Sequence, residues 1–336
     1  MQVRINNKVL LVLCVVTPIF LVFISLFIGR YPLSISQVVT ILTSGYNNIA
    51  AGITPIQHTV LWDMRMPRAL MALLVGGALA VSGGALQGVF RNPLVDSGML
   101  GVSAGAGFGA CIAIILFHNI FFTYVFAFAF GIIAVVLSYA TGKIYKTAPT
   151  VTLVLGGVVI SSIFSALISF TKYVADPYEQ LPAITFWLMG SLARANYADL
   201  AIAMIPIFIG IIGIMLIRWR INLLSLGDRE AGTLGVNTTL CRGIIIASTA
   251  LATAGAVCIS GTIGWIGLVI PHIGRMIVGN DNRRLLPLCL AMGGSFLLIV
   301  DDLGRSITGS EIPLGVLTAL IGGPFYIYLL KKTKGG

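Results

Sequence analysis

The sequence predicts an all-α, polytopic membrane protein from its composition and from the length and texture of its apolar segments. Hydrophobic residues make up 57% of the 336 residues and charged residues 10%, and the mean hydropathy is +1.01. A soluble domain is roughly half apolar and a quarter charged. Long apolar runs without period-two alternation favour helices over a closed barrel. Since about 20 apolar residues cross a bilayer as a helix, about ten spans fit into this length.

Ten spans can be placed in one transmembrane domain, residues 1–336. The first is too long for the core of a signal peptide, and no small-residue cleavage site follows it, so we expect it to stay uncleaved. The eighth is too short to cross alone, and we expect it to continue an irregular segment at 261–270. A short helix at 181–193 is expected before the sixth span. The predicted spans are 9–29, 67–87, 98–117, 120–142, 150–171, 197–217, 242–260, 271–280, 286–306 and 312–330.

The lysine and arginine residues predict how these spans are oriented. If the N-terminus lies in the cytoplasm, the inner segments hold 14 of them and the outer segments 6, with Arg275 inside the eighth span. Basic residues collect in cytoplasmic loops. We therefore expect both termini in the cytoplasm, together with the loop at about 218–242. The same rule accounts for the net charge of +10 without a nucleic-acid partner.

The motifs that carry covalent chemistry are missing from the sequence. It contains no G-x-x-x-x-G-K-[ST] loop, no H-E-x-x-H and no nucleophile elbow. Its five cysteines form no C-x-x-C, and its three histidines lack metal-ligand spacing. We expect no catalytic residue, metal site or cofactor in this chain. Small residues at four-residue spacing, such as Gly101, Gly105 and Gly109, are expected to pack helices together.

The predicted spans also contain few charges that could couple transport to an ion. Secondary transporters need ionisable groups near the middle of the bilayer. Asp301 and Asp302 come closest, but they lie towards the outer end of the ninth span, and a structural or docking pair is the favoured interpretation. Energy for transport would then enter from outside the chain, and the polar stretch LLSLGDREAGTLGVN (223–237) is where we expect it to enter.

Four long segments carry a resemblance to a known family, and they follow one another in its order between about residues 31 and 332. They resemble FecCD-type permeases, the membrane subunits of binding-protein-dependent ABC importers for iron siderophores, haem and cobalamin. The segments are RMPRALMALLVGGALAVSGGALQGVFRNPLVDSGMLGVSAGAGFGA (65–110), LLSLGDREAGTLGV (223–236), GTIGWIGLVIPHIGR (261–275) and EIPLGVLTALIGGPFYIYLL (311–330).

The resemblance implies a multi-pass inner-membrane permease that is not itself an enzyme, with a fold similar to that of cobalamin-importer permeases. It further implies that a second copy completes the pathway and that two cytoplasmic ATP-binding subunits drive it. A periplasmic or lipid-anchored binding protein would deliver the substrate. An iron siderophore is the default substrate, while haem, cobalamin and a molybdate-type oxyanion stay open. An ATP-independent secondary transporter or channel is the alternative, and a membrane-embedded enzyme is a weaker one.

The resemblance assigns a coupling helix, which contacts the ATPase, to the polar stretch. Leu223, Leu224, Leu226 and Leu234 would anchor this helix, and Asp228, Arg229 and Glu230 would face the partner or water. A solvated loop with routine charges is the alternative interpretation. The coupling residues implied are Leu226, Gly227, Asp228, Arg229, Glu230, Ala231, Leu234 and Gly235.

Two further sets of residues take their roles from the resemblance. Arg65, Arg68 and Arg305 match outward arginines that dock the binding protein, a task that suits the bidentate guanidinium, although Arg68 could instead snorkel at the membrane interface. Serines of the fifth span could line the pathway or bond back to their own helix. Val151 departs from the small polar pair expected at the gate. The pathway and gate residues implied are Thr150, Val151, Ser161, Ser162, Ser165 and Trp187, with Phe186 beside them.

Overall fold

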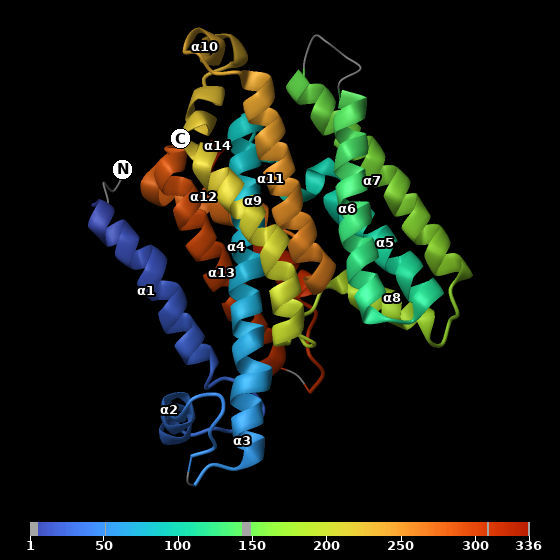
Figure 1. Ribbon diagram of the computed structural model, residues 1–336. Coiled ribbons are helices and arrows are strands. Elements are labelled where there is room, and N and C mark those ends of the chain that lie inside the picture. Colours follow the sequence, from blue (N-terminus) through green and yellow to red (C-terminus); the bar gives the residue numbers. More distant parts are fainter. Residues whose placement is uncertain (1–5, 51, 143–148, 308, 335–336) are drawn as a thin grey trace.

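The computed structural model of the chain is a bundle of long helices (Figure 1). It describes residues 6–50, 52–142, 149–307 and 309–334, and no strand occurs within those ranges. The helices are α1 (Asn7–Ser25), α2 (Ile35–Ser44), α3 (Pro55–Thr59), the π-helical η1 (Val60–Arg65), α4 (Met66–Phe90), the 3₁₀ turn η2 (Ser97–Leu100), α5 (Val102–Phe117), α6 (Ile120–Gly142), α7 (Pro149–Val174), α8 (Gln180–Met189), α9 (Tyr197–Leu224), α10 (Asp228–Thr233), α11 (Thr238–Ser260), α12 (Ile266–Val278), α13 (Asn282–Ser306) and α14 (Leu314–Lys334).

Each of the ten predicted spans coincides with one of these helices. Among the described residues, six helical stretches are long and apolar enough to cross a bilayer by themselves, and shorter apolar helices lie among them. The start of α1 and the finish of α14 lie at the end of the bundle that carries α10, which we call the α10 end (Figure 1). Helices α2 and α3 lie at the opposite end, the α2 end.

Helix α4 forms the centre of the bundle and is buried along most of its length. It packs against α9, α11, α12 and α13. A Cβ atom on Gly76 would collide with the backbone of Gly293 in α13, so these two helices touch through their main chains. Gly105 and Gly109 of α5 face the backbone of α6 in the same way, which confirms the predicted packing role of these glycines.

The helix that contains the second span is longer than predicted. It runs without a break from Pro55 to Phe90, through α3, η1 and α4. Thr54 and Gln57 form a capping box at its start, and Pro55 takes the first helical position. Helix α2 begins in the same way, with a capping box made by Ser34 and Gln37. Both S/T-x-x-Q signals are legible in the sequence and could have predicted these starts.

The eighth span also starts earlier than predicted, at Ile266 instead of Pro271, so only residues 261–265 are irregular. Proline has no N–H, and the carbonyl of Gly267 would therefore lose its partner four residues on. Gln87 Nε2 of α4 donates to that carbonyl at 3.0 Å. Because the free carbonyl is satisfied by a neighbouring helix, α12 continues through the proline inside the bundle.

Candidate functional site

Helix α10 projects from the bundle between α9 and α11 (Figure 1). Gly227 before it has a φ of +135° and Gly235 after it a φ of +79°, backbone conformations that glycine adopts without strain. Arg242 Nη2 of α11 donates to Asp228 Oδ1 at 2.7 Å. The side chain of Ala231 is fully buried. These contacts hold the short helix in a fixed place against the bundle.

The leucines around α10 divide into two pairs. Leu224 is buried and Leu223 is partly buried, as anchors should be. Leu226 and Leu234 are each 58% exposed, so the prediction that they anchor the helix is wrong. A helix of six residues makes fewer than two turns and rests on the bundle along one face. Ala231 occupies that face, and Leu226 and Leu234 are left outside it.

The charged residues of α10 follow the prediction in part. Arg229 and Glu230 are exposed. Asp228 is only partly exposed because it is paired with the buried Arg242. Leu240, at the start of α11, is 57% exposed. The three exposed leucines next to α10, namely Leu226, Leu234 and Leu240, are called the flanking leucines below. They place several exposed apolar side chains close together in a segment between two long helices, and such a cluster is typical of a contact surface for another protein.

Arg68 lies at the α2 end with its guanidinium fully occupied. Its Nε and Nη2 donate to Asp301 at 2.8 and 2.9 Å, and its Nη1 and Nη2 donate to Glu311 at 2.9 Å each. The side chain of Asp301 is completely buried and that of Arg68 is 11% exposed. This one arginine therefore ties α4, α13 and the loop before α14 together.

Arg65 and Arg305 also turn into the protein. Arg65 donates to the carbonyls of Leu26 at 2.6 Å and Tyr31 at 2.5 Å. Arg305 donates to Ser25 and forms an ion pair with Asp302. The exposed fractions of Arg65 and Arg305 are 4% and 7%, so the expectation that these residues present outward cations is wrong. These partners could not be predicted from the sequence, because the main-chain acceptors lie at the end of α1 and in the segment that follows it.

Glu311 belongs to the loop between α13 and α14, outside the helices. Burial raises the pKa of its carboxyl, but the hydrogen bonds and the charge of Arg68 lower it by more, and the pKa ends below its usual value. The same loop is held by two main-chain bonds. Ile312 N donates to Gly304 O at 3.1 Å, and Leu314 N donates to Gly190 O at 2.9 Å. The loop thus links Arg68 to the end of α8.

Helix α7 exposes a long apolar face that also contains serines. Val151 is 59% exposed, Ser162 and Ser165 are exposed, and Ser161 is half-buried. Ser162 Oγ donates to Val158 O at 2.9 Å, as the back-bonding alternative requires. Thr150 lies in the first turn of α7, and its side chain is outside the described part of the structure. The gate and pathway roles of these residues stay predictions.

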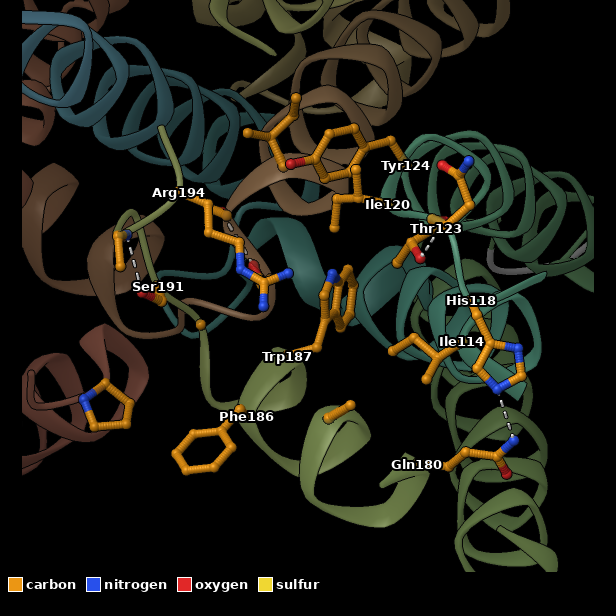
Figure 2. Close-up of a pocket in the computed structure, with 18 of the residues that line it drawn as sticks. Ile114, His118, Ile120, Thr123, Tyr124, Gln180, Phe186, Trp187, Ser191 and Arg194 are labelled. Carbon is orange, nitrogen blue, oxygen red and sulfur yellow. Dashed lines mark hydrogen bonds between the residues drawn. The ribbon is translucent and has the colours of Figure 1, made fainter. Parts of the chain in front are cut away.

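A cavity of about 550 Å³ lies beside α8, between the α5–α6 turn, the segment that joins α8 to α9, the end of α11 and the loop before α14. Figure 2 shows Trp187 pointing into it from α8, and Phe186 of the same helix also lines it. Arg194, from the segment between α8 and α9, reaches in towards Trp187, and Tyr124 closes one side (Figure 2). Of these residues the sequence singled out Trp187 and Phe186 as candidates for ligand contact and missed Arg194 and Tyr124, since no motif links them.

The described residues contain no group of three or more His, Cys, Asp or Glu side chains that could hold a metal ion. A model of the FecCD transport family matches residues 16–332. The chain belongs to the FecCD transport family. FecCD-family relatives include the molybdate import system permease MolB of Haemophilus influenzae, 42% identical over 315 residues that cover 93% of this chain and 92% of MolB. The hemin transport system permease HmuU of Yersinia pestis is 36% identical to this chain over 279 residues, which cover 81% of this chain and 83% of HmuU.

A solved transporter structure agrees with the fold. It is an inward-facing ABC transporter classed as metal-chelate type, 38% identical to this chain, with a TM-score of 0.86 and coverage of 97% of this chain and all of that one. This chain is therefore an ABC importer permease and a multi-pass inner-membrane protein. The FecCD relatives are named as permease subunits, which is consistent with a role in conduction for this chain.

Proposed function

We propose that this FecCD-family chain forms the pathway of an importer with a second copy of itself, driven by two cytoplasmic ATP-binding subunits. A periplasmic or lipid-anchored protein delivers a metal chelate or a molybdate-type oxyanion to the α2 end. The α10 end faces the cytoplasm, as the excess of basic residues in its loops favours. The chain itself binds no nucleotide in this scheme, in keeping with the missing G-x-x-x-x-G-K-[ST] loop.

The observation that carries this proposal is the exposed helix α10. Its position is fixed by the Asp228–Arg242 ion pair and by the buried Ala231. The flanking leucines are exposed at the α10 end of the bundle, opposite α2. A fixed short helix with an unpartnered apolar rim fits a groove on another protein, and movement of that protein would be passed to α9 and α11.

The exposed face of α7 supports a second copy of the chain. Leu155, Val159 and Ile163 on this helix are all more than half exposed, which suits either lipid or a partner helix. Ser165 is exposed on the same helix, where lipid offers no hydrogen-bond partner and a polar pathway does. Helix α14 is similarly uncovered at Leu320. A pathway between two copies would use both helices.

A secondary transporter, the alternative function, finds less support in the described spans. The acidic pair Asp301 and Asp302 is engaged by Arg68 and Arg305 at the α2 end. A carboxylate held by an arginine is poorly placed to bind and release a proton or sodium ion during a transport cycle.

Uptake into proteoliposomes tests the proposed function. The chain is reconstituted with its Walker-motif ATPase and its binding protein, and substrate uptake is measured with and without ATP inside. Uptake that needs ATP and both partners supports the proposal. Equal uptake by the chain alone, driven by an ion gradient, would establish the secondary transporter instead. Mass spectrometry and metal analysis of the purified binding protein identify the substrate used.

A further inference from the structure

The cavity beside α8 contains two strong donors for which the described residues supply no acceptor. Arg194 is exposed, and its guanidinium has neither a hydrogen bond nor an ion pair with any described residue. Trp187 Nε1 is shielded from solvent and has no acceptor within the described ranges. Figure 2 shows both side chains directed into the same space. A buried N–H without a partner is unfavourable, and such a group in a native structure calls for an absent acceptor.

The other polar groups around the cavity do not supply an acceptor for Arg194 or for the Trp187 N–H. Tyr124 donates its hydroxyl to Asp199 at 3.0 Å, which occupies that proton. His118 and Gln180 are bonded to each other at 3.3 Å. The first turn of α6, which lines the cavity, directs the positive end of a 23-residue helix at it. Together these features favour an acceptor-rich, negatively charged guest near Arg194.

Two carboxylates also border the cavity, and neither cancels Arg194. Glu311 is already bonded to Arg68. Glu179 is exposed and precedes the ten-residue α8, while Arg194 follows that helix. At 1.5 Å per residue, α8 separates the two by about 15 Å. The volume of about 550 Å³ falls within the range of small-molecule sites.

We infer that this cavity is a subsite for an oxyanion group, held by the Arg194 guanidinium and the Trp187 indole N–H. The inference rests on the proposed function for its purpose, since it gives the importer a holding point for an anionic substrate beside α8. The group could be an inorganic oxyanion or a carboxylate of a metal chelate. Both offer the oxygen acceptors that Arg194 and Trp187 lack.

Binding of two probes to the purified chain in nanodiscs tests the inference. Sodium molybdate represents the inorganic oxyanion and ferric citrate the carboxylate chelate, and each is titrated by calorimetry. We expect one or both to bind wild-type protein and Arg194→Gln to bind at least about tenfold more weakly, because the charged hydrogen bonds are lost. Trp187→Phe keeps the ring, removes the donor and should bind a few-fold more weakly. The control Tyr178→Phe changes an exposed residue outside the cavity lining and should bind as wild type does.

The outcomes separate this inference from the proposed function. Binding of molybdate alone identifies an inorganic oxyanion, and binding of ferric citrate alone identifies a chelate. The inference is overturned if wild-type protein binds neither probe, or if Arg194→Gln binds as tightly as wild type while its thermal unfolding is unchanged. ATP-driven uptake by the assembled wild-type importer is measured in parallel. If uptake succeeds but neither probe binds, the subsite is rejected and the proposed function stands. If uptake fails but the probes bind as expected, only the proposed function is rejected.

Discussion

The α10 end and the α2 end both carry charged residues near helix ends, but they use them in opposite ways. At the α10 end, Arg229 and Glu230 are exposed and leucines accompany them at the surface. At the α2 end, Arg65 and Arg305 are buried and Arg68 is fully paired. The first arrangement leaves groups free for a partner, and the second locks helices together. A charge near the end of a span predicts the side of the membrane, and only its neighbours decide whether it is available.

The largest effect should come from the exposed leucines of the α10 end. Leu226→Asp combined with Leu234→Asp should lower ATP-driven uptake by at least about tenfold, because burying a leucine contributes about 1.5–3 kcal/mol and both contacts would be lost. Thr239→Asp adds a charge at the exposed start of α11 and serves as the matched control. Uptake near the wild-type level in the double variant, at equal membrane abundance, would remove α10 as the point of coupling.

The next largest effect concerns stability at the α2 end. Asp301→Asn should lower the free energy of unfolding by about 3–5 kcal/mol, because it leaves the guanidinium of Arg68 without its buried partner. Thermal unfolding in detergent measures this. Arg283→Gln breaks the exposed pair with Asp281 and should change stability by less than about 1 kcal/mol. Replacing both members, as Arg68→Met with Asp301→Leu, should restore most of the loss, and a double variant as unstable as Asp301→Asn would contradict this account.

A smaller effect should follow pH at the α2 end. The pKa of Glu311 is lowered in the folded chain, so its contribution to stability is full above the ordinary value of 4.5 and is lost as pH falls through the folded pKa. The thermal unfolding temperature of wild type should therefore fall below about pH 4.5, by more than protonation of the other carboxyl groups would cause. Glu311→Gln should lack this part of the pH dependence and be slightly less stable at pH 7. Identical pH profiles for the two proteins would show that the Arg68–Glu311 bond contributes nothing to stability.

The sequence was sufficient for most of the fold and for less of the site. Long apolar runs predict helices because lipid supplies no hydrogen-bond partner for the backbone, so the N–H and C=O groups must pair within the segment. All ten predicted spans coincide with helices. The start of α12 was misplaced because a proline normally opens or breaks a helix, and only the distant Gln87 allows it inside one. The two capping boxes were legible, but they lie outside the apolar runs from which the spans were predicted.

Side-chain availability could not be predicted because it depends on contacts between residues far apart in the chain. Arg68 meets Asp301 across 233 positions, and Arg305 meets Ser25 across 280. The sequence likewise gave no reason to bring Arg194 together with Trp187, since their shared cavity is built by four helices. The polar stretch before α11 was the exception. Its exposure depends on local features, because it follows from a short helix between two glycines.

The smallest effect should come from the ion pair that fixes α10. Asp228 is 39% exposed at its side chain, so its bond to Arg242 is screened by water and contributes no more than about 1 kcal/mol. Asp228→Asn can still accept a hydrogen bond from Arg242 and should retain more than about half of the ATP-driven uptake. Asp228→Lys places two cations together and should displace α10, with a clearly larger loss. Equal uptake by these two variants would mean that the position of α10 is held by Ala231 alone, and that the ion pair is a surface contact without a part in coupling.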